Sequence, residues 1–206
     1  MQNNAEKINP WLNIWFRPRE TFNYVLNNPH NLHKGILIFL GGFSYSLSRA
    51  YGLHLGNTLG FEKIIIFSLM LGPISGLVVV YLGSFILKTI GRIFKGIASY
   101  SGLQSVIIWS MVPLIGLLPI WLIRFLLLGA ETFTASGAAR GWNSPVLLLL
   151  NGIHLGLALW MYVILAKGLS VAEGFSMWKA IGTMLIAFMV FIVLFVIIAL
   201  TFLPLF

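Results

Sequence analysis

Two polar side chains lie close together in a strongly apolar part of the sequence. Asn151 and His154 fall within the run 146–166, which is long enough to cross a membrane, and they are about one helical turn apart. Polar groups at that depth cost free energy unless a partner satisfies them, so they mark a candidate functional site. We interpret the pair as a polar cluster inside the membrane, with ordinary polar packing as the alternative.

The residues around Ser75 come close to the pattern of a nucleophilic serine. Membrane proteases of the rhomboid type carry Gly-x-Ser-Gly together with a histidine on a later span, but here Pro73 stands in place of the first glycine. The chain also lacks His-Glu-x-x-His, paired intramembrane aspartates, a Walker loop and a dinucleotide-binding glycine motif. The sequence therefore predicts no catalytic residue, no cofactor and no enzymatic activity.

His30 and His33 are close enough in sequence to share a metal ion. The chain has no Cys and no Asp, and no carboxylate stands near the two histidines to complete a ligand set. We therefore predict no metal site. Coupled transport usually needs buried carboxylates, whereas Glu62, Glu131 and Glu173 fall in or beside the expected loops, which leaves a passive pore as the transport alternative.

The composition indicates a membrane protein. Hydrophobic residues make up 59% of the chain and charged residues only 9%, far below the charge of soluble domains. The formal net charge is +8, yet the basic residues stand singly between apolar runs instead of clustering as in nucleic-acid binders. This distribution predicts contact with anionic lipid headgroups and no nucleic-acid partner.

The apolar runs predict an all-α membrane domain at 35–206, preceded by a cytoplasmic N-terminal segment at 1–34. The five expected spans are 35–54, 64–87, 103–122, 146–166 and 181–203. Basic residues favour one side of these spans: Lys7, Arg17, Arg19, Lys34, Lys88, Arg92, Lys95, Lys167 and Lys179, against Lys63 and Arg140 on the other. The positive-inside rule then places the N-terminus in the cytoplasm and the C-terminus outside. Arg49 and Arg124 are expected to snorkel to the outer interface.

The N-terminal segment predicts two short amphipathic helices separated at Arg17, because a residue before proline avoids the α conformation. Aromatic and aliphatic residues recur at helical spacing in both segments, and in the second they lie opposite polar residues. We expect these helices to lie in the headgroup plane; the alternative is that they pack against the bundle. The candidate membrane-interface residues are Trp11, Trp15, Arg17, Arg19 and Phe22.

The third span is irregular. Pro113 and Pro119 each remove an intrahelical hydrogen bond, and Gly116 lies between them, so we predict a kinked or broken helix. The following stretch, 121–128, is expected at the outer interface, and 129–145 is expected to be a surface connection.

Small residues recur at four-residue spacing in three spans, at Gly72 and Gly76, at Gly152 and Gly156, and at Ser44 and Ser48. Such faces let helix backbones approach closely. They predict either a homo-oligomer or packing within the bundle.

Two longer stretches resemble the Yip domain family of Ypt/Rab-interacting membrane proteins, in its prokaryotic form. The first is Asn9-Pro-Trp-Leu-Asn-Ile-Trp-Phe-Arg-Pro-Arg-Glu-Thr-Phe followed by Asn28-Pro29, and the second is Gly96-Ile-Ala-Ser-Tyr-Ser-Gly-Leu-Gln-Ser-Val-Ile-Ile-Trp-Ser-Met-Val-Pro113. The resemblance implies membrane organisation, and in eukaryotic relatives also trafficking and Rab binding. Those relatives carry a longer cytosolic N-terminal region, which weighs against a Rab-type GTPase as partner here and favours a prokaryotic inner membrane.

These observations predict a non-enzymatic membrane scaffold that contacts lipid or a membrane-protein partner through interfacial helices and basic loops. The alternative is a small permease or channel with a polar path near Asn151 and His154.

Overall fold

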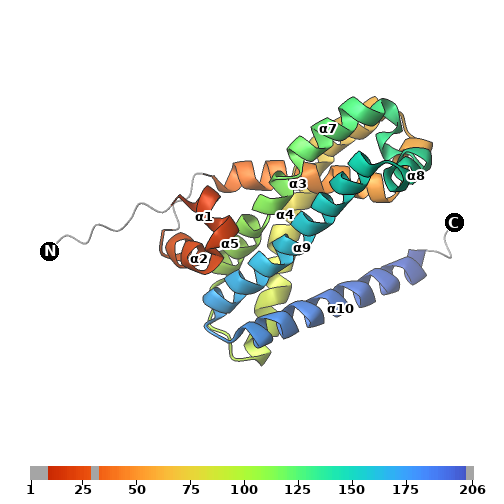
Figure 1. The fold of residues 1–206 in the computed structure, drawn as a ribbon. Helices are drawn as coiled ribbons and strands as arrows, with labels where there is room; N and C mark the ends of the chain where they lie inside the picture. The colour runs from red at the N-terminus through yellow and green to blue at the C-terminus, as the bar shows by residue number, and fades with distance from the viewer. Residues whose placement is uncertain (1–8, 29–32, 203–206) are drawn as a thin grey trace.

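Helix is the regular secondary structure throughout the residues that the structure describes. The structure is a computed structural model that describes residues 9–28 and 33–202, and these contain helices and turns but no strand (Figure 1). In chain order the helices are α1 (Pro10–Phe16), α2 (Pro18–Asn27), α3 (Lys34–Gly52), η1 (Leu55–Asn57), α4 (Phe61–Ile93), α5 (Tyr100–Ser110), α6 (Val112–Ile115), α7 (Leu118–Leu128), η2 (Gly129–Phe133), α8 (Ala135–Asn143), α9 (Pro145–Glu173) and α10 (Met177–Phe202). The all-α fold class is confirmed.

Within residues 9–28 and 33–202, three helical stretches are long and apolar enough to cross a membrane. They are α4, the interrupted stretch Tyr100–Phe133 that contains α5 to α7, and α9; Met177–Val193 of α10 is a shorter apolar helix. α3 is more polar, because three serines and Arg49 occupy its second half. The helices also extend beyond the apolar runs, since α4 has 33 residues and α9 has 29.

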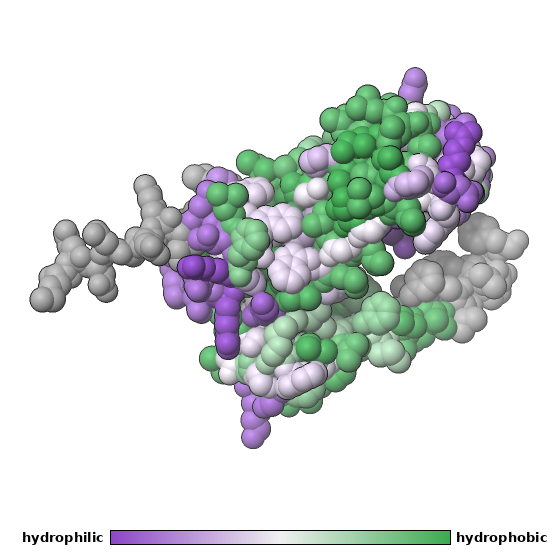
Figure 2. All heavy atoms as spheres, viewed as in Figure 1, coloured by the Kyte–Doolittle hydropathy of each residue, from purple (hydrophilic) through white to green (hydrophobic). Residues whose placement is uncertain are grey.

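The long helices run back and forth between two ends of an elongated bundle (Figure 1). α1, α2 and the loops before α5 and α10 form one end, and α7, η2 and α8 form the other. Figure 2 shows hydrophobic residues over the middle of one face, with hydrophilic residues gathered around α1–α2 and around α8. An apolar belt between two polar ends is the surface that a bilayer requires.

α3 and α4 pack with their backbones in direct contact. A methyl group added at Gly42 would overlap the carbonyl group of Gly72, and one added at Gly76 would lie 2.9 Å from the carbonyl oxygen of Ile38. The Gly72 and Gly76 face therefore packs within the chain. The face with Gly152 and Gly156 differs, because no described atom lies within 4 Å of an added methyl group there.

The predicted break in the third span is present. α5 ends before Met111, and the short α6 is followed by a turn at Gly116 before α7 begins, with Pro113 and Pro119 each in the first turn of a helix. A break frees carbonyl groups that need new partners inside a membrane. Ser44 of α3 supplies one, since its hydroxyl donates to the carbonyl oxygen of Leu114 at 2.5 Å.

Candidate functional site

Asn151 and His154, predicted as an intramembrane polar cluster, lie beside three residues from other helices. Arg124 and Trp121 come from α7, and Tyr51 comes from the last turn of α3. We call these five residues the Arg124 cluster. It lies near the end of the bundle that α8 covers (Figure 1).

The amide of Asn151 joins the members of the cluster. Its Oδ1 accepts a hydrogen bond from Arg124 Nη2 at 2.6 Å and another from the Tyr51 hydroxyl at 3.2 Å. Its Nδ2 donates to the carbonyl oxygen of Gly141 in α8 at 3.4 Å. A methyl group added at Gly141 would lie 3.0 Å from Asn151 Nδ2, so α8 lies directly on the cluster.

Arg124 is a buried cation, with only 1% of its surface exposed. Its guanidinium carbon lies 4.9 Å from the ring centre of Tyr51 and 5.8 Å from that of Trp121, distances suited to cation–π attraction. Among the described residues the salt bridges join other pairs, and Arg124 has no carboxylate partner. The positive charge is therefore stabilised by an amide and by aromatic faces.

His154 packs among aromatic rings. The ring centres of His154 and Trp121 lie 5.4 Å apart in an edge-on arrangement, and Tyr51 stacks at 6.5 Å. Within the described part of the chain, His154 Nδ1, Trp121 Nε1 and Arg124 Nε are buried without a hydrogen-bond partner. Ser75 does not join this site, because it belongs to α4 and its hydroxyl donates to Gly72 of the same helix at 2.7 Å.

The prediction that Arg124 snorkels to the outer interface is wrong. The physical reason is the segment 129–145, expected as a surface connection, which instead folds back as η2 against α7 and as α8 against α9. The hydroxyl of Thr132 donates to the carbonyl oxygen of Arg124 at 3.3 Å, and Phe133 stacks on Trp121 at 5.9 Å. The stretch 121–128 is accordingly half covered, with Trp121 1% exposed and Leu126 79% exposed.

The N-terminal helices form where the sequence predicts them. The side chain of Asn9 accepts a hydrogen bond from the backbone N–H of Trp11 at 3.1 Å and so caps α1. Arg17 lies between the two helices, and Pro18 occupies the first turn of α2. The division at Arg17 is confirmed.

Three of the predicted interface residues face the bundle. Phe22 is fully buried, and a methyl group added at Gly168 of α9 would lie 2.7 Å from its ring. The ring centre of Trp11 lies 5.8 Å from that of Trp109, and Trp15 lies 3.0 Å from a methyl group added at Gly116. The prediction that Phe22 is a membrane-interface residue is wrong, because α9 offers a glycine against which the ring packs.

The side chains that α1 and α2 do expose are different ones. Phe16 is 89% exposed and Leu12 is 65% exposed, and Arg17 and Arg19 are exposed beside them. Arg17 forms an ion pair with Glu20 at 3.6 Å. The outward face of this segment is thus aromatic, aliphatic and basic, but its apolar members are Leu12 and Phe16.

Of the two histidines considered as metal ligands, the structure describes only His33. His33 packs edge-on against Trp11 with ring centres 6.0 Å apart, and His30 lies outside the described residues, as do Lys7 and residues 203–206. Among residues 9–28 and 33–202, no three His, Cys, Asp or Glu side chains are arranged as metal ligands.

Glu173 is a buried group that sequence reasoning placed in or beside a loop. It ends α9 and is 3% exposed, and its Oε2 accepts a hydrogen bond from the backbone N–H of Ala98 at 2.9 Å. Methyl groups added at Gly91 or Gly96 would overlap its carboxylate. Gly91 in the last turn of α4 and Gly96 in the loop that follows both leave room for this side chain, and such a pair of glycines is the signal that could have revealed it.

A helical chain with several helices suited to crossing a bilayer, an apolar belt and two polar ends is a polytopic integral membrane protein. The family model of the Yip1 domain matches residues 12–198, nearly the whole of the 206-residue chain. The chain belongs to the Yip1 domain family, which confirms the resemblance noted in its sequence. No curated protein and no solved structure matches it.

Proposed function

We propose that this protein is a non-enzymatic membrane scaffold that contacts lipid or a membrane-protein partner through its α1–α2 end. The observation that carries the proposal is the anchoring of these two helices. Ile14 and Phe22 are fully buried, so Leu12, Phe16 and Arg19 are presented in fixed positions. A rigid face of exposed aromatic, aliphatic and basic side chains suits a docking surface at a membrane.

In this proposal the chain crosses the membrane five times, by α3, α4, the α5–α7 stretch, α9 and α10. The N-terminus is cytoplasmic and the C-terminus is outside, in a prokaryotic inner membrane. Support comes from charge, since basic residues concentrate at the α1–α2 end of the bundle. Those in the described part of the chain are Arg17, Arg19, Lys34, Lys88, Arg92, Lys95, Lys167 and Lys179.

The alternative, a permease or channel near Asn151 and His154, would need a polar path through the bundle. Several span hydroxyls are instead engaged with backbone: Ser110 donates to Val106 at 2.7 Å and Ser48 to Ser44 at 3.0 Å. The core around α5 and α6 is apolar and includes Trp109 and Leu117, both fully buried. A polar cluster with a buried cation, beside an apolar core, favours a structural role for Arg124 and Asn151.

Two measurements on the full chain test the proposal. A photo-crosslinking amino acid at Phe16 should capture lipid or a neighbouring protein in native membranes, whereas the same group at Ile14 should react only within the chain. In proteoliposomes, ion and small-solute efflux should equal that of empty liposomes. Efflux that disappears in Asn151→Ala or His154→Ala would overturn the scaffold and favour the permease.

A further inference from the structure

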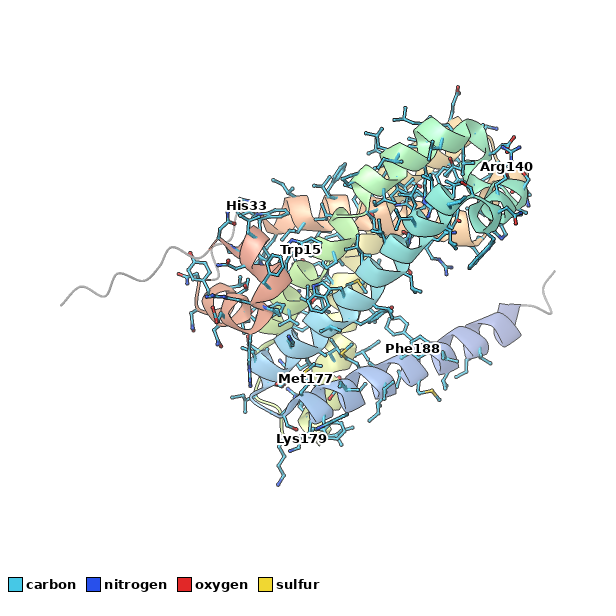
Figure 3. All side chains as sticks on the ribbon, in the orientation of Figure 1. Trp15, His33, Arg140, Met177, Lys179 and Phe188 are labelled. Atoms are coloured by element: carbon cyan, nitrogen blue, oxygen red, sulfur yellow. The ribbon has the colours of Figure 1, made fainter. Side chains whose placement is uncertain are left out.

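α2, the end of α9 and the start of α10 enclose a groove of about 620 Å³. Its lining includes Phe16, Arg19, Lys167, Ser170, Ser176 and Met177. A neighbouring groove shares Arg19, Ser170 and Ser176, so the two are continuous. In Figure 3, Met177 lies at the start of α10, beside the end of α9.

The groove brings together two cations that lack acidic partners. Arg17 and Glu20 also line the groove and pair with each other at 3.6 Å, but among the described residues no carboxylate lies within ion-pair distance of Arg19 or Lys167. The ammonium group of Lys167 lies 5.9 Å from the ring centre of Trp160, a weak contact that leaves its charge without an anion. The unbalanced charge favours an anionic ligand.

The same groove offers hydrogen-bond donors at a helix start. Ser176 immediately precedes α10, whose first backbone N–H groups have no partner within the helix. In the described residues the hydroxyl of Ser170 is engaged with the carbonyl oxygen of Phe175 at 2.6 Å, while that of Ser176 makes no bond. A helix start, a free hydroxyl and two cations together match the donors that bind a phosphate.

The apolar rim distinguishes this groove from a site for a soluble anion. Phe16, which is 89% exposed, and Met177 of α10 both line the groove. Lys167 directly follows the apolar run 146–166, which places its charge where a span meets the headgroups. A ligand that fits would carry a phosphate on one part and a hydrocarbon chain on another.

We propose that this groove binds one anionic phospholipid, with its phosphate contacted by Arg19 and Lys167 and its acyl chain lying against Phe16 and Met177. The proposal rests on the proposed function, in which the α1–α2 end meets the membrane surface, and it names the ligand of that end. Ser176 and the start of α10 donate hydrogen bonds to the phosphate oxygens. The groove thereby ties α2, α9 and α10 together through a lipid.

Native mass spectrometry of the full chain in detergent tests the site, with phosphatidylglycerol as the probe and phosphatidylcholine as the zwitterionic comparison. The groove variant is Arg19→Gln with Lys167→Gln. The matched control is Arg92→Gln with Lys179→Gln, which removes two exposed cations at the same end that do not line the groove; Lys179 points away from the bundle in Figure 3. In the groove variant, the affinity for one bound phosphatidylglycerol should fall at least about tenfold, so that this adduct is lost. The control variant should retain it.

If both variants lose the phosphatidylglycerol adduct equally, the effect is general charge attraction and the site is overturned. The site is also overturned if the unaltered protein retains phosphatidylcholine as well as it retains phosphatidylglycerol. Displacement of the lipid by millimolar inorganic phosphate would show a soluble-anion site instead. Arg19→Glu alone, at an exposed position, repeats the test if the double variant does not fold. If the lipid site fails but Phe16 still crosslinks to a protein, the lipid proposal is overturned and the scaffold proposal stands. If the protein releases solute while the lipid is still bound, only the scaffold proposal is overturned.

Discussion

Phe22 of α2 packs directly against Gly168 of α9, and this contact fastens the N-terminal segment to the bundle. Phe22→Ala should lower the free energy of unfolding by about 3 kcal/mol, because it removes a fully buried ring and leaves a cavity. Phe16→Ala is the matched control; it removes an 89% exposed ring and should cost less than about 0.5 kcal/mol. Thermal unfolding in detergent measures both, and equal destabilisation would contradict the anchoring.

Asn151→Ala should destabilise the protein by about 2 kcal/mol, since it leaves the buried guanidinium of Arg124 without its amide partner. Arg124→Met should cost less, because it removes the charge together with its desolvation penalty. Tyr51→Phe removes one hydrogen bond to the same oxygen and should cost about 1 kcal/mol. A greater cost for Arg124→Met than for Asn151→Ala would mean that the cation has a stabilising partner beyond this cluster.

Ser44→Ala should destabilise the break in the third span by about 1.5 kcal/mol, because the carbonyl of Leu114 loses the hydroxyl that satisfies it. Ser48→Ala is the control, since its hydroxyl donates to Ser44 within α3. Its cost should stay near zero. Equal unfolding midpoints for the two variants would show that the break needs no partner from α3.

Single cysteines test the orientation, since the chain has none of its own. Ile97→Cys and Ser136→Cys suit the two ends, because both side chains are exposed. Gly96, in the same loop as Ile97, is unsuitable because a side chain there would collide with Glu173. A membrane-impermeant thiol reagent should label the Ser136 site in intact cells and the Ile97 site only after lysis; the reverse pattern would invert the proposed topology.

Local sequence chemistry was sufficient for the helical class, the division at Arg17 and the break around Pro113. Each depends on apolar run length or on the geometry that proline imposes on its own neighbourhood. The residues at which the helices end were harder to predict from the sequence. α9 continues to Glu173, beyond its apolar run, where the backbone N–H of Ala98 donates a hydrogen bond to Oε2 of the carboxylate.

The orientation of Phe22 and the burial of Arg124 could not be read from the sequence for a different reason. A lipid tail and a protein interior are equally apolar, so an amphipathic pattern does not tell which of them covers Phe22. Arg124 would reach the interface if residues 129–145 stayed away from the bundle, but η2 packs against α7 and α8 packs against α9 beside it. Both depend on contacts between segments distant in the chain.

The backbone contact between Gly42 of α3 and Gly72 of α4 has a consequence for biogenesis. α3 carries Ser44, Ser46 and Arg49. The hydroxyl of Ser46 donates a hydrogen bond to that of Ser68 at 3.2 Å, so its partner lies on α4. A segment of this polarity gains little from entering lipid alone. We therefore expect α3 to leave the translocon paired with α4, as a preassembled helical hairpin whose insertion depends on the second helix.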